Sequence, residues 1–113
     1  MLFEKCRGLI IAEAVLNAVA LWAEEKEFSL AFRVEAFNNC REQGLILYAS
    51  RDFETKLTVY VYNHRNTDKP TVTFEYCYGD SIYSKEAWQY RTMQFDGIWG
   101  AVNFICNLIV SVY

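Results

Sequence analysis

The chain has 113 residues, carries a net charge of −3, and is 53% hydrophobic and 17% aromatic. This length suits one domain of roughly 100–150 residues, and so apolar a chain with a single proline is unlike a disordered one. The mildly acidic balance argues against a basic stripe that follows nucleic-acid phosphates. We therefore expect one folded domain over residues 1–113 that does not bind nucleic acid directly.

The first predicted element is a helix over about residues 2–25. Its residues have high helix propensity, and they form a wide apolar face with a narrow polar stripe that contains Glu13 and Asn17. The early basic residues and the apolar middle also resemble a signal peptide. Because Glu13 and Asn17 interrupt the apolar run, we favour an amphipathic helix and a cytoplasmic protein over a cleaved signal or a membrane anchor.

Three carboxylates, Glu24, Glu25 and Glu27, lie at the end of this helix. The helix dipole disfavours negative charge at a helix C-terminus. The simpler interpretation is a solvated turn. The alternative hypothesis is that these three residues form an acidic surface that binds a basic partner protein.

The next segment, residues 28–37, is ambiguous. Its apolar residues alternate with period two, which predicts a half-buried strand. A weaker helical stripe has Ser29 as a candidate N-cap and Gly44 just past its end. We choose the strand over 28–37 and leave a helix over 28–43 as the alternative.

Three further strands are predicted over residues 44–50, 56–64 and 71–78. Each is rich in β-branched and aromatic residues, and polar turn sequences separate them. Consecutive strands that are joined by short turns form an antiparallel meander. The sequence therefore predicts a four-stranded antiparallel meander sheet.

After this sheet the chain is predicted to return to helix. Ser84 is a plausible N-cap for a helix over 84–95, and Asp96 can cap a second helix over 97–113. Gly97 and Gly100 leave open whether this region is one helix or two. The predicted fold class is α+β, with the sheet flanked by an N-terminal helix and one or two C-terminal helices in the order α-β-β-β-β-α-α.

The last seventeen residues contain no charge. On a helix, Ile105 and Ile109 lie on a broad apolar face, and Asn103 and Asn107 lie on a narrow polar stripe. A membrane span is the less favoured alternative, because it needs about 20 residues. We predict instead that these four residues contribute to a homodimer, in which the apolar strip is covered by a second copy.

The sequence offers little chemistry. It contains none of the common nucleotide-binding, zinc-protease or hydrolase motifs, and His64 is the single histidine. The four cysteines, at positions 6, 40, 77 and 106, lack zinc-site spacing. We interpret them as reduced thiols, with two disulfides of a secreted domain as the alternative. No catalytic residue, metal or cofactor is expected, and we interpret Glu13 as a surface or ion-paired residue.

The eight tyrosines are the most informative excess. Tyr60 and Tyr62 share one side of a predicted strand with His64, opposite its aliphatic side. If helices cover the aliphatic side, these three residues are candidates for binding a partner protein. The alternatives are stacking of single-stranded RNA bases and burial under a covering helix.

By size and character, the chain resembles the small single-domain inhibitors that phages use against bacterial defence nucleases, anti-CRISPR proteins included. This is a likeness of class that no shared motif carries. The first hypothesis is a non-enzymatic protein-binding module that inhibits a larger macromolecule by steric occlusion. The second is a small-ligand-binding or enzymatic domain with a pocket between sheet and helices, and a nucleic-acid-binding module is third.

Overall fold

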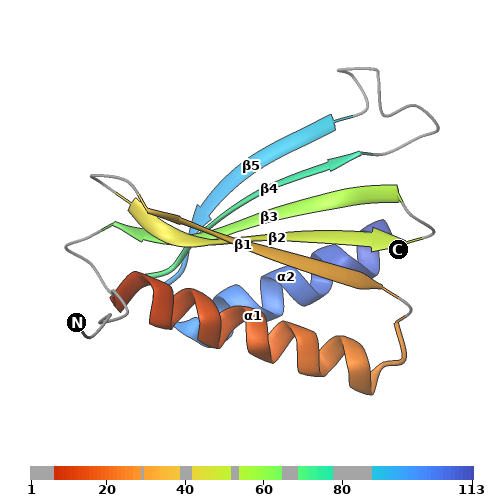
Figure 1. Cartoon of the computed structure of the whole chain (residues 1–113), viewed down its shortest axis with the longest axis horizontal. Coiled ribbons are helices and arrows are strands. Elements are labelled where there is room, and N and C mark those ends of the chain that lie inside the picture. Colours follow the sequence, from red (N-terminus) through yellow and green to blue (C-terminus); the bar gives the residue numbers. More distant parts are fainter. Residues whose placement is uncertain (1–6, 29, 39–41, 52–53, 65–68, 78–87) are drawn as a thin grey trace.

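The computed structural model describes residues 7–28, 30–38, 42–51, 54–64, 69–77 and 88–113 (Figure 1). The elements along the chain are α1 (Arg7–Glu25), β1 (Ala31–Asn38), β2 (Glu42–Arg51), β3 (Glu54–His64), β4 (Thr71–Cys77), β5 (Trp88–Gln94) and α2 (Ile98–Val112). The predicted first helix and the first four strands are thus confirmed, with shifts of a few residues at their ends. Residues 2–6 of the predicted helix lie outside the described residues.

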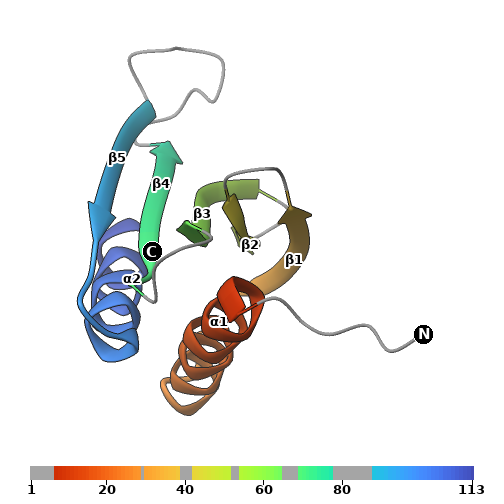
Figure 2. The same ribbon diagram turned by 90° about the vertical axis from the view of Figure 1, so that its left-hand side faces the viewer.

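All five strands belong to one sheet. Their order is β1-β2-β3-β4-β5, and every neighbouring pair is antiparallel. Both helices lie on the same side of this sheet (Figure 2). The predicted α+β class is confirmed: an antiparallel meander lies between an N-terminal and a C-terminal helix.

The fifth strand corrects a prediction. A helix was expected over 84–95, but within the described part of this segment β5 pairs with β4 from Trp88 opposite Cys77 to Gln94 opposite Thr71. Ser84, the expected N-cap, lies outside the described residues. Without β5, the backbone N–H and C=O groups on this edge of β4 would have no strand partner. The hydrogen bonds and side-chain contacts that form when β5 pairs with β4 outweigh the helix propensity of the segment.

The core lies between the sheet and the two helices. Helix α1 packs over β2 and β3, and α2 packs beside α1 and over β3 and β4. Alternate residues of the central strands meet the apolar faces of the helices, as strand geometry requires. The buried apolar residues of this core are Ala12, Val15, Leu16, Val19, Leu45, Leu47, Ala49, Leu57, Val59, Val61, Val72, Phe74, Ala101, Val102, Ile105, Cys106 and Ile109.

The charge-free end of the chain forms a single helix, α2. It begins after Gly97, whose backbone is extended (φ −151°, ψ 170°). Gly97 is the N-cap residue, and no side chain caps the helix there with a hydrogen bond. Asp96 was expected to cap this helix and instead forms an ion pair with Lys69 at 3.2 Å. The Tyr113 hydroxyl donates a hydrogen bond to the Ala49 carbonyl at 2.7 Å, which ties the chain end to β2. Among the described residues, neither helix has the length and apolarity that crossing a membrane requires.

Candidate functional site

The side of the sheet opposite the two described helices, α1 and α2, is called the open face. Strand register places alternate residues of each strand on it. Its described members are Ala31, Arg33, Glu35, Phe37, Gly44, Ile46, Tyr48, Ser50, Thr58, Tyr60, Tyr62, Thr71, Thr73, Glu75, Thr92 and Gln94. Aromatic, hydroxyl-bearing and charged side chains dominate this face, whereas aliphatic side chains dominate the helix side.

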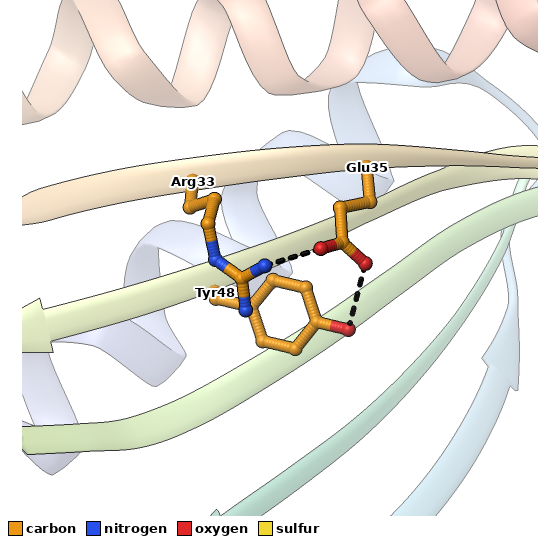
Figure 3. Close-up of polar contacts among 3 residues, drawn as sticks. All are labelled: Arg33, Glu35 and Tyr48. Carbon is orange, nitrogen blue, oxygen red and sulfur yellow. Dashed lines mark hydrogen bonds and ion pairs between the residues drawn. The ribbon is translucent and has the colours of Figure 1, made fainter.

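One end of the open face carries a three-residue network (Figure 3). The Arg33 guanidinium lies over the Tyr48 ring, 4.1 Å from its centroid, and forms an ion pair with Glu35. The Tyr48 hydroxyl donates a hydrogen bond to Glu35 Oε2 at 3.3 Å. These contacts leave the charges locally balanced.

The other end is built around a glycine. Gly44 pairs with Phe37 on β1 and with Tyr62 on β3, and the two aromatic rings meet edge to face with centroids 6.1 Å apart. A Cβ atom at Gly44 would lie 2.2 Å from the Val61 carbonyl oxygen. A side chain cannot be accommodated at this position, and its absence lets the rings meet across β2.

Hydroxyl groups connect β3, β4 and β5. The Tyr62 hydroxyl lies 3.2 Å from Thr73 Oγ1, and Thr73 Oγ1 lies 3.0 Å from Thr92 Oγ1. Thr58 and Thr73 are buried between larger side chains, and Tyr60 and Tyr62 are half-buried. The open face therefore combines aromatic area with oriented hydroxyls, the chemistry that is enriched in protein interfaces.

The predicted partner-binding residues separate into two groups. Tyr60 and Tyr62 lie on the open face, and His64 ends β3 with a side chain outside the described part. The three glutamates lie at the end of α1, on the helix side of the sheet, and are exposed. The structure does not bring the two groups together.

A helix-ending motif explains the turn at the glutamates. Glu27 has a left-handed φ of 58°, its N–H donates to the Glu24 carbonyl, and the Phe28 N–H donates to the Ala23 carbonyl, both at 3.1 Å. This is the bonding pattern of a Schellman motif. Glu27 therefore closes the helix, which agrees with the simpler interpretation of a solvated turn.

The predicted dimer residues also divide. Ile105 and Ile109 are fully buried in the core of their own chain, because this side of α2 faces the sheet. They are therefore not available to a second copy. Asn103 and Asn107 are exposed on the outer side of α2.

Two grooves border the helices. One, of about 410 Å³, lies between α1 and strands β1 and β2 and has Glu13 and Asn17 in its lining. The other, of about 470 Å³, lies between α1 and α2 and includes Trp22 and Trp99. The described residues contain no cluster of His, Cys, Asp or Glu that would hold a metal ion.

Cys106 lines the groove between the helices. It has a free thiol, and burial raises the pKa of this thiol, so the neutral form is favoured. This agrees with the interpretation of a reduced thiol that acts as a small apolar residue. The side chains of Cys6, Cys40 and Cys77 lie outside the described part.

Three features of these surfaces were missed at the sequence level. The contact of Arg33 with Tyr48 depends on the pairing of β1 with β2, and Thr92 joins the open face through β5, which was expected to be helical. Trp99, which is 71% exposed, was assigned no role, although its place on the polar side of α2, one turn before Asn103, is visible in the helical spacing.

No family model, curated protein or solved structure matches this chain. A fold by itself does not assign a function. The chemistry of the open face and of the helix layer must therefore carry the functional argument.

Proposed function

We propose that this protein is a non-enzymatic binding module that docks a partner protein on its open face. The observation that carries the proposal is the set of half-buried rings of Tyr48, Tyr60 and Tyr62 on the side of the sheet opposite α1 and α2. Tyrosine gives large contact area at low entropic cost, with a hydroxyl for orientation. The hydroxyl contacts among the strands hold several of these groups in place before a partner arrives.

Charge favours a protein over a nucleic acid as the partner. Among the described open-face members, Arg33 is the one cationic residue, and it already pairs with Glu35. Nucleic-acid binding depends on several cations that contact phosphates. A neutral face of rings and hydroxyls suits a protein surface of similar polarity.

The proposed mode of action is steric. A five-stranded sheet backed by two helices gives a rigid platform that can cover the working surface of a larger macromolecule without chemistry of its own. The finer proposal is an inhibitor of the phage anti-defence type. A cytoplasmic location is part of this proposal.

The test compares two double variants of the tagged protein. Tyr60→Ala with Tyr62→Ala removes aromatic area from the open face. Val34→Ala with Met93→Ala is the matched control, because it removes exposed apolar side chains from the same sheet on its opposite side. Each protein is used to capture partners from a nuclease-treated bacterial lysate, and bound proteins are identified by mass spectrometry.

We expect the unmodified protein and the control to retain the same partner and the tyrosine variant to lose it. A photo-crosslinking amino acid at position 60 should join this partner covalently, whereas the same group at position 34 should not. Equal capture by both variants would contradict the open face as the binding surface. Capture that occurs only from a parallel lysate without nuclease would favour RNA binding instead.

One observation favours a second candidate function, small-ligand binding. The groove between α1 and β1 is lined largely by apolar side chains that include Leu16, Phe32 and Leu47, with Glu13 beside them. Apolar clefts with a few polar groups are typical ligand sites. Val34→Trp would fill this groove, so a bound apolar dye such as anilinonaphthalene sulfonate should be displaced from this variant but not from the tyrosine variant.

A further inference from the structure

The outer side of the two helices is unusually apolar. Among the described residues, six large apolar side chains are exposed, and four of them lie on this side: Ile10 (52%), Leu21 (62%), Trp99 (71%) and Val110 (56%). The outer helix surface is defined here by these four residues together with Ala14, Asn17, Asn103 and Asn107, which are also exposed. An apolar patch of this kind on a small protein marks an interaction site.

We propose that the outer helix surface binds a second copy of this chain in a two-fold dimer. None of its eight residues is charged, although each chain has a net charge of −3 and the exposed Glu24 and Glu25 follow Leu21 at the end of α1. Two acidic copies repel each other unless they meet through neutral surfaces. A neutral patch is complementary to itself, which a two-fold interface requires.

The topology favours an antiparallel pairing. Five antiparallel strands separate the helices, so α1 and α2 run in the same direction (Figure 1). A two-fold axis that crosses both helices would place each helix antiparallel to its counterpart in the second copy. About the middle of α2, Asn103 would then lie opposite Asn107 of the second copy, and each amide offers both a donor and an acceptor.

The same arrangement works on α1. Ile10 and Leu21 are symmetric about the middle of the exposed strip, so each would lie opposite the other residue in the second copy. The acidic C-terminal end of α1, with Glu24 and Glu25, would approach the N-terminal end of the second α1. Because helix N-termini carry partial positive charge, this offsets the unfavourable placement of carboxylates at a helix C-terminus.

Area and shape are adequate for a stable contact. Helix α1 has 19 residues, so it is about 28 Å long. Helix α2 has 15 residues and is about 22 Å long. Two helices about 10 Å wide therefore give a face of roughly 500 Å² in projection, and protruding side chains raise its accessible area towards the roughly 800 Å² per partner of a standard interface. The groove of about 470 Å³ between the helices provides a hollow for a side chain of the second copy.

Such a dimer would hold the two open faces on opposite outer sides. If the open face binds a partner as proposed above, the dimer is bivalent and can engage two sites at once. This consequence rests on the proposed function, whereas the dimer itself does not.

Light scattering coupled to size exclusion tests the dimer without any partner. The unmodified chain, 13.2 kDa, should show about twice that mass from low to several hundred micromolar. Trp99→Glu with Leu21→Glu should be monomeric, because each copy would bury two carboxylates at the interface. Met93→Glu, which places a carboxylate at an exposed apolar position of β5, should remain dimeric.

A monomeric mass for the unmodified chain over this range, or a dimeric mass for the charged variant, would overturn the proposal. Tryptophan emission gives a second readout that does not depend on the charged variant folding. Dilution below the range in which the chain is dimeric should shift the emission to the red, and Trp99→Phe should lose this shift. Flotation of monomers with phosphatidylcholine vesicles would assign the surface to lipid and would also overturn the dimer.

Discussion

Alternate residues of β3 meet two different environments. Towards the helices, Leu57, Val59 and Val61 are fully buried, and towards the open face, Tyr60 and Tyr62 keep part of their surface in solvent. A single strand thus contributes to the core on one side and to a polar, aromatic surface on the other. The period of two separates stability from binding at the level of single residues.

The two sides of the sheet also differ in which residues their side chains contact. Side chains on the helix side contact residues far away in the sequence, from both ends of the chain. Side chains on the open face contact neighbouring strands through hydroxyls and rings, and Arg33 forms an ion pair with Glu35 on the same strand. Substitutions on the helix side should therefore change stability, whereas substitutions on the open face should mainly change binding.

The largest expected effect is on the helix side. Ile105→Ala removes a fully buried side chain and should lower the free energy of unfolding by about 2–5 kcal/mol. Val110→Ala on the same helix removes an exposed side chain and should cost far less. Urea unfolding at one protein concentration measures both, and equal losses would contradict the assignment of the two sides of α2.

The next largest loss of stability is expected at Gly44, where the backbones of β2 and β3 approach too closely for a side chain. Gly44→Ala should destabilise by about 1–3 kcal/mol, as overpacking does, because the new Cβ meets the backbone of β3. Gly97→Ala is the control, since a Cβ there meets nothing within 4 Å. A thermal melt of Gly44→Ala that matches that of Gly97→Ala would mean that the strands can separate locally at no cost.

Much of the fold could be predicted from the sequence because its strands alternate clearly. The alternation of aliphatic and polar residues in β3 sets both faces, and the periodicity of α1 sets its buried side. The segment 84–95 misled because Ser84 and the residues after it suit a helix start, while pairing with β4 is a long-range effect. The pattern of residues within one segment cannot predict that another strand of the fold has an unpaired edge on which this segment can pair.

The candidate surfaces were predicted less completely. Alternation alone placed Tyr60 and Tyr62 on one side of their strand. The edge-to-face contact of Phe37 with Tyr62 depends on Gly44 and on the register of three strands, which no single segment encodes. In α2 almost every side is apolar, so periodicity could not tell that the side with Ile105 and Ile109 packs on the sheet of its own chain rather than on a second copy.

A smaller effect on stability is expected on the open face. Tyr60→Ala with Tyr62→Ala should keep the fold and lose about 1–2 kcal/mol, through the hydrogen bond between Tyr62 and Thr73 and the ring contact between Tyr62 and Phe37. Truncation of a fully buried aromatic residue costs about 3–5 kcal/mol. A melting curve measures the difference, and a loss of that larger size would place these tyrosines in the core and remove the open face as a binding surface.

The smallest effect is expected from the ion pair of Arg33 with Glu35. Their side chains are 64% and 48% exposed, so water screens the pair, and exposed pairs contribute about 0–1 kcal/mol. A double-mutant cycle with Arg33→Ala and Glu35→Gln should give a coupling energy within that range, and salt should reduce it further. Tyr48 remains beside Arg33 in the Glu35→Gln variant, so its ring contact is retained.

A coupling energy of about 3 kcal/mol or more that salt does not change would be that of a buried pair. It would mean that this end of the open face is covered in solution, which would reduce the area left for a partner protein.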